Sequence, residues 1–131
     1  MMKHSHFLIV IGGFFGLSAV MLGAFGAHAL QPTLESRGTT AVWKTAVDYQ
    51  MWHALALLLT AHYKSYNRAV LSALWCFSLG VLLFSGSLYW LALGGPRWLG
   101  PITPLGGLLF IAGWASLIYA ALKMKHESVS R

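Results

Sequence analysis

Four long apolar stretches, separated by short polar segments, dominate the sequence. The first, third and fourth cover residues 7–30, 69–93 and 105–122 and contain no acidic residue, lysine or arginine. A helix of about 20 apolar residues, rising roughly 1.5 Å per residue, matches the hydrocarbon core of a bilayer. These three stretches are therefore predicted to be transmembrane helices.

The second stretch is more polar than the others. Its purely hydrophobic part, residues 51–63, has 13 residues and is too short to cross a bilayer alone. We therefore extend this predicted helix to residues 41–63, which places Lys44 and Asp48 at or inside the membrane boundary. Asp48 is expected either to pair with Lys44, one helical turn earlier, or to remain hydrated at the interface.

Proline and polar residues mark the predicted connections. Proline lacks the amide proton that a helix interior needs, so Pro32 is expected to end the first helix. Three of the chain's four prolines fall between residues 94 and 104, which predicts a non-helical loop. The remaining polar segments predict a connection at 31–40, a tight turn at 64–68 and a frayed tail at 123–131.

The composition agrees with a membrane protein and limits its size. Hydrophobic residues make up 57% of the 131 residues and charged residues only 9%, against about 25% charged in soluble domains. The sequence therefore predicts a single integral membrane domain over residues 1–131, an all-α protein built as a four-transmembrane-helix bundle. The net charge of +6 comes from bases scattered at helix ends, which argues against a nucleic-acid partner.

The basic residues also predict the orientation of the bundle. Four crossings put both termini on one side of the membrane, and that side carries six lysines and arginines. The opposite side carries Arg37, Lys44 and Arg97. By the positive-inside rule, both termini are expected to be cytoplasmic.

Small residues recur at helical spacing on the first and fourth predicted helices. In lipid, small residues let helix backbones approach closely, so such stripes predict packing against a partner helix. A sister helix or another chain is a possible partner, and the protein is expected to form a homo-oligomer or to join a membrane complex. The predicted packing residues are Gly12, Gly16, Ala19, Gly23 and Ala27 on the first helix, and Gly106 and Gly113 on the fourth.

Ionisable and polar residues at membrane depth form the candidate site. Tyr49 and His53 share one face of the second helix, and His53 falls near mid-membrane, where a neutral imidazole is expected to bond to a serine, tyrosine or carbonyl of a facing helix. His28 and Asp48 fall near the outer boundary. The candidate intramembrane polar cluster is His28, Asp48, Tyr49, Gln50 and His53. No catalytic residue, metal site or cofactor is predicted, because paired carboxylates, nucleophile motifs and metal-ligand spacings are missing.

Four segments resemble a known family. They are GAFGAHAL at residues 23–30, YQMWHALALLL at 49–59, LFSGSLYWLALGG at 83–95 and LGPITPLGGLLFIAGW at 99–114. Together they resemble small four-helix bacterial inner-membrane proteins of unknown function, related to the eukaryotic transmembrane protein 256. The resemblance implies an integral, multi-pass protein of the bacterial inner membrane, and it implies no activity, substrate or cofactor.

Three functional hypotheses follow from the sequence. The leading one is a non-enzymatic structural or accessory role, in which helix packing joins the protein to itself or to a larger membrane complex. The second is an oligomeric conduit or transporter for a small solute or ion, lined by the polar face of the second helix. The third is a haem or other redox module, with His28 and His53 as the only plausible axial pair.

Overall fold

The computed structural model describes residues 2–62 and 67–129, with side chains for residues 6–62 and 67–123. All regular structure in these two ranges is helical. The α-helices are α1 (Met2–Ala27), α2 (Gln31–Arg37), α3 (Thr40–Thr60), α4 (Arg68–Gly80), α5 (Gly86–Ala92) and α6 (Ile102–Val129). A π-helical segment, Val81–Ser85, joins α4 to α5, and a short 3₁₀ turn, Arg97–Leu99, precedes α6.

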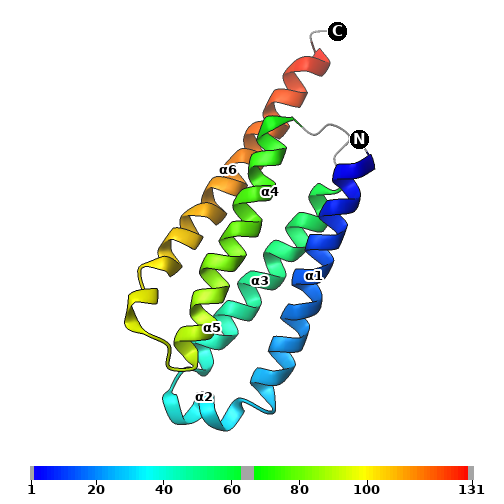
Figure 1. The fold of residues 1–131 in the computed structure, drawn as a ribbon. Coiled ribbons are helices and arrows are strands. Elements are labelled where there is room, and N and C mark those ends of the chain that lie inside the picture. Colours follow the sequence, from blue (N-terminus) through cyan, green and yellow to red (C-terminus); the bar gives the residue numbers. More distant parts are fainter. Residues whose placement is uncertain (1, 63–66, 130–131) are drawn as a thin grey trace.

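The helices form four long rods: α1, α3, the continuous run from α4 to α5, and α6. Figure 1 shows that the start of α1 and the end of α6 lie at the same end of the bundle. The short helix α2 and the connection from α5 to α6 lie at the opposite end (Figure 1). Neighbouring rods along the chain therefore run antiparallel.

Three of the rods are long and apolar enough to cross a membrane. Among the described residues, these segments are His6–Ala27, Arg68–Ala92 and Arg97–Lys123. Their exposed surface is rich in large apolar side chains such as Val10, Leu82 and Ile111. The fourth rod, α3, is long enough but falls short in hydropathy, since its 21 residues include charged and amide side chains.

The buried core joins all four rods around α3. Leu57 of α3 packs in one cluster with Leu8 of α1, Phe77 of α4 and Phe110 of α6. A second cluster, close to α2, contains Leu34, Trp43 and Ala92. Since α3 contributes to both clusters, it is the element that holds the bundle together.

The first predicted connection differs from the structure. The first helix ends at Ala27 rather than at residue 30, and Pro32 lies in the first turn of α2 instead of terminating α1. Proline is tolerated there because the first turn of a helix has no hydrogen-bond partner for its amide groups. Gly38 then ends α2 with a φ of +66°, a left-handed conformation that glycine adopts readily.

The prediction for the last helix was also too short. The helix α6 begins at Ile102, so Pro104 lies within its first turn, and it continues to Val129 through most of the predicted frayed tail. Lysine, methionine and glutamate in that tail are good helix formers.

The third predicted helix matches Arg68–Ala92 but is interrupted by the π segment. Residue 63 of the second predicted helix and residues 64–66 of the predicted turn at 64–68 lie outside the described residues.

Candidate functional site

Gln50 is the polar centre of the bundle. Its side chain is 4% exposed and is bonded to two other rods. The amide nitrogen donates to the carbonyl of Phe15 at 2.9 Å and to the hydroxyl of Ser18 at 2.7 Å, both on α1. Its Oε1 accepts a 2.9 Å bond from the hydroxyl of Tyr89 on α5. One side chain of α3 therefore ties α1 to α5.

Further polar contacts connect the same rods. The hydroxyl of Ser85 donates to the carbonyl of Ala46 at 2.8 Å, and the hydroxyl of Thr39 donates to the carbonyl of Ala92 at 2.8 Å. Among the described residues, every buried side-chain nitrogen and oxygen has a hydrogen-bond partner. The polar groups inside the bundle thus bond to the protein itself.

His53 is held by two hydrogen bonds and a stacked ring. Its Nδ1 lies 2.7 Å from the carbonyl oxygen of Tyr49, and its Nε2 lies 3.1 Å from the indole Nε1 of Trp114 on α6. A carbonyl only accepts and an indole N–H only donates, so the proton is on Nδ1 and the imidazole is neutral. The ring also stacks on Phe110, with centroids 3.6 Å apart and an interplanar angle of 8°.

A groove opens beside His53, between α3 and α6. Its volume is about 650 Å³. We call it the α3–α6 groove, and its lining residues are Tyr49, Trp52, His53, Phe84, Pro104, Gly107, Leu108, Phe110, Ile111 and Trp114. Five of these ten are phenylalanine, tyrosine or tryptophan, so aromatic rings form much of the wall.

The π segment between α4 and α5 contributes to this groove. It brings Phe84 to the lining, with its ring centroid 4.6 Å from that of Tyr49. The next residue, Ser85, is buried and bonds to α3. π-Helical turns are rare and occur often at functional sites. The irregular turn thus coincides with the groove and with a contact to α3.

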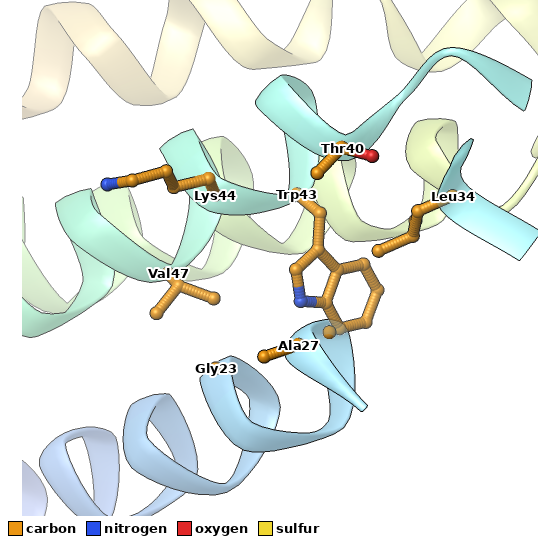
Figure 2. Close-up of a pocket in the computed structure, with 8 residues that line it drawn as sticks. Gly23, Ala27, Leu34, Thr40, Trp43, Lys44 and Val47 are labelled. Atoms are coloured by element: carbon orange, nitrogen blue, oxygen red, sulfur yellow. The ribbon is translucent and has the colours of Figure 1, made fainter. Parts of the chain in front are cut away.

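A smaller pocket lies at the other end of α3. Figure 2 shows the indole of Trp43 directed toward α1, with Leu34 of α2 nearby. The pocket has a volume of about 280 Å³. The indole Nε1 of Trp43 donates to the carbonyl of Leu22 at 2.9 Å and lies where a side chain on Gly26 would be. Trp43 therefore fixes the end of α1 against α3.

The predicted polar cluster is divided between different environments. Tyr49 and Gln50 are adjacent in α3, and His53 lies one turn later. His53 bonds to the carbonyl of Tyr49 and to Trp114, whereas the side chain of Gln50 bonds to α1 and α5. Asp48 forms an ion pair with Lys44, which is one of the two alternatives expected from the sequence. His28 is exposed just beyond the end of α1, and no hydrogen bond, ion pair or ring contact in the described chain joins it to Asp48 or His53.

The predicted small-residue stripe on α1 meets α3 of the same chain only in part. A side chain at Gly12 would contact Leu58, and one at Gly23 would contact Val47, while Ala19 is fully buried. A side chain at Gly16 would meet nothing within 4 Å, and Ala27 is exposed. The buried small residue near the end of α1 is Gly26, in place of the predicted Ala27.

The two predicted glycines of α6 both face the rod formed by α4 and α5. A Cβ atom on Gly106 would lie under 3 Å from backbone atoms of Phe84, and one on Gly113 would lie under 3 Å from the ring of Phe77. Gly80 of α4 is similarly covered by the ring of Phe110. These glycines thus allow close approach between helices of the same chain.

Several residues of the site were not identified from the sequence. Trp114 bonds to His53, while Ser18 and Tyr89 bond to Gln50. The only sequence signal was indirect, because a buried histidine or glutamine needs a partner. Helical periodicity gives the face on which a residue lies, but it does not give the residue opposite.

The fold and the polar layer of α3 define an all-helical, multi-pass membrane protein. Residues 22–107 match a family described as a protein of unknown function, DUF423. The chain belongs to this family, and it is an integral protein of the bacterial inner membrane.

Three similar curated proteins are membrane proteins by name. A UPF0382 membrane protein of Staphylococcus haemolyticus is 46% identical over 88% of this chain and 94% of its own length. The UPF0382 membrane protein YwdK of Bacillus subtilis is 43% identical over 88% of this chain and 95% of its own length. The UPF0382 inner membrane protein YgdD of Escherichia coli is 38% identical over 96% of this chain and 97% of its own length. No solved structure matches this chain.

Proposed function

We propose that α3 is a fourth transmembrane helix. At about 1.5 Å per residue, its 21 residues extend about 31 Å, close to the thickness of the hydrocarbon core. It lies beside α1 in the bundle (Figure 1). Its polar groups Gln50 and His53 are buried and bonded inside the protein, and its two charged groups, Lys44 and Asp48, form an ion pair. Such bonding lowers the cost of placing them in lipid.

Four crossings also agree with the positive-inside rule. The end of the bundle that holds the start of α1 and the end of α6 contains Arg68 and Lys123. The other end contains Arg37 and Arg97. Counted over the whole sequence, bases are six to three in favour of the first end. This end is therefore proposed to face the cytoplasm, with both termini.

The proposed role is that of a non-enzymatic accessory protein that associates with itself or with a larger membrane complex. The observation that carries this proposal is the saturated hydrogen bonding of Gln50, whose nitrogen and oxygen bind α1 and α5. A conduit needs polar groups that remain available to a passing solute. Gln50 instead supports a rigid body whose contacts with other molecules are made by its outer surface.

The outer face of α1 is the surface proposed for this association. A side chain on Gly13 or Gly16 would meet nothing within 4 Å, and the neighbouring Phe14 and Leu17 are 64% and 63% exposed. In lipid, glycine allows another helix to approach closely and gain van der Waals contact. No residue of α1 lines the α3–α6 groove, so the two surfaces can be tested separately.

Native mass spectrometry from a mild detergent or from nanodiscs tests the accessory role. The wild-type chain is expected as a dimer, a higher oligomer or a defined complex. Gly13→Leu should shift the population toward the monomer, because the new side chain blocks close approach. Gly86→Leu is the matched control, since Gly86 is also open and lies on α5. A strictly monomeric wild-type particle without a co-purifying partner would contradict the proposal.

A further inference from the structure

The α3–α6 groove has walls suited to a flat ring. The aromatic residues of its lining are Tyr49, Trp52, Phe84, Phe110 and Trp114. A hydrocarbon chain packs equally well on leucine or valine, which cover much of the remaining outer surface. Aromatic walls add favourable stacked and edge-to-face contacts when the guest itself is a flat ring.

Contacts within the protein hold the side chains of the groove in place without a ligand. The bond from Trp114 to His53 and the stack of His53 on Phe110 fix three of its side chains. Tyr49 is fixed by its ring contacts with Trp52 and Phe84, at centroid distances of 4.9 and 4.6 Å. A preformed site loses little side-chain entropy on binding, and this favours affinity.

Two hydrogen-bond donors of the groove lining have no protein partner. Among the residues whose side chains are described, none pairs with the hydroxyl of Tyr49 or with the indole N–H of Trp52. Both residues line the groove, and no lysine, arginine or carboxylate does. A ligand that fits this lining is therefore uncharged and carries a hydrogen-bond acceptor such as a carbonyl oxygen.

The depth of Tyr49 selects among neutral lipids. Tyr49 is the tenth of the 21 residues of α3, which places it about 14 Å from the nearer end of that helix. Phospholipid headgroups and ester carbonyls lie at the membrane boundary, outside the hydrocarbon core. An acceptor at the level of Tyr49 must instead belong to a molecule that carries its polar ring into the core.

Gly107 leaves the space that such a ring would occupy. It lines the groove from α6, and the nearest atoms to a Cβ there would be those of the Phe84 ring, 3.8 and 3.9 Å away. These are ordinary van der Waals distances, so packing does not require glycine at this position. A larger side chain at Gly107 would project into the groove.

We propose that the α3–α6 groove binds a neutral lipophile whose flat ring carries carbonyl oxygens, the chemistry of a lipid-soluble quinone. The ring lies against Tyr49 and Phe84, and a carbonyl accepts a hydrogen bond from the hydroxyl of Tyr49. Because no residue of α1 lines the groove, this proposal goes beyond the accessory role and does not depend on it, but it rests on the proposed transmembrane course of α3.

Tryptophan fluorescence of the protein in nanodiscs tests the proposal, with a decyl-substituted 1,4-benzoquinone as the probe. Trp52 and Trp114 line the groove, so a bound quinone should quench their emission in a saturable manner. Quinone dissolved in the bilayer gives only a linear background. Decylbenzene, which has the same tail and no carbonyl, should not displace the quinone.

Substitutions assign the saturable signal to the groove. Gly107→Leu should weaken quinone binding at least tenfold, and Tyr49→Phe about fivefold, the net effect of losing one neutral hydrogen bond. Gly86→Leu and Tyr119→Phe are the matched controls, because both residues are exposed outside the groove. Neither control should change the affinity.

Three results would overturn the proposal. They are linear quenching alone in the wild-type protein, unchanged affinity in Gly107→Leu, and loss of the saturable quenching when decylbenzene is added at the concentration of the quinone. If Gly107→Leu fails to fold by circular dichroism, Tyr49→Phe decides, and unchanged affinity there counts against the proposal. Native mass spectra of the same nanodiscs report association independently, so the failure of one proposal is distinguishable from the failure of the other.

Discussion

The indole N–H of Trp114 donates a 3.1 Å hydrogen bond to Nε2 of His53, across the space between α6 and α3. The two residues are 61 positions apart in the sequence. Because the other ring nitrogen of His53 bonds to the carbonyl of Tyr49, both polar atoms of the imidazole are used inside the protein. The histidine therefore connects two helices and forms part of the groove wall.

A double-mutant cycle should detect the bond between His53 and Trp114. His53→Phe and Trp114→Phe each leave one polar group unpaired, and each is expected to lower the free energy of unfolding by about 1 to 2 kcal/mol. Their coupling energy should be near 0.6 kcal/mol, the average for hydrogen bonds between transmembrane helices. Reversible unfolding in mixed micelles with increasing dodecyl sulfate measures all four proteins. Trp75→Phe, at an exposed position on α4, is the control, and strictly additive effects would contradict the bond.

Gln50 should be the most sensitive polar position of the bundle. Gln50→Leu removes three hydrogen bonds and leaves the hydroxyl of Tyr89 unpaired, so the free energy of unfolding should fall by about 2 to 3 kcal/mol. Ser18→Ala and Tyr89→Phe should each cost less, about 1 kcal/mol. The same micelle titration applies. Thr45→Ala serves as the control, since that hydroxyl bonds only within its own helix, and an equal loss there would argue against a special role for Gln50.

Alanine substitutions at two adjacent glycines of α6 should have different effects on stability. Gly106→Ala places a Cβ under 3 Å from backbone atoms of Phe84, and overpacking of this kind destabilises by about 1 to 3 kcal/mol. Gly107→Ala places its Cβ at an ordinary distance from the Phe84 ring and should be neutral or stabilising by up to about 1 kcal/mol. Thermal unfolding followed by circular dichroism compares the pair. Similar melting temperatures for the two variants would refute this packing.

Cysteine labelling should establish the orientation of the bundle. In a Cys76→Ala background, Ser36→Cys in α2 is expected to react with an impermeant maleimide added to intact spheroplasts. His62→Cys, in the turn that follows α3 at the other end, is expected to react only after the membrane is permeabilised. The positive-inside rule predicts this pattern. Labelling of both positions from outside would show that α3 does not cross the membrane.

The sequence predicted the membrane environment and most of the helices, because both depend on local properties. Runs of about 20 apolar residues define spanning helices wherever they occur in a chain. The pairing of Lys44 with Asp48 was one of two alternatives that the sequence left open, and it was recognisable because residues four apart on a helix are neighbours whatever surrounds them. The helix ends at Pro32 and Pro104 were misjudged, because a proline stops a helix in its interior but is tolerated in its first turn.

The candidate site was predictable only in part. Tyr49, Gln50 and His53 stood out as polar residues at membrane depth, but their partners Trp114, Tyr89 and Ser18 did not. The contribution of Phe84 to the groove was not predictable from the sequence either, because a π-helical turn of apolar residues has the same hydrophobic pattern as a regular transmembrane helix. The small residues of α1 and α6 were expected to meet partner helices, and periodicity did not specify whether those helices belong to the same chain.

By itself, the sequence determined that this chain resides in lipid and that it forms apolar helices, since the transfer of apolar residues and the hydrogen bonding of the backbone are settled within each segment. Only the tertiary structure decided that α3 lies at the centre, that Gln50 and His53 bond to neighbouring helices, and that an aromatic groove remains between α3 and α6. Those features depend on which side chains meet across helices, and such contacts follow from the packing of the whole bundle.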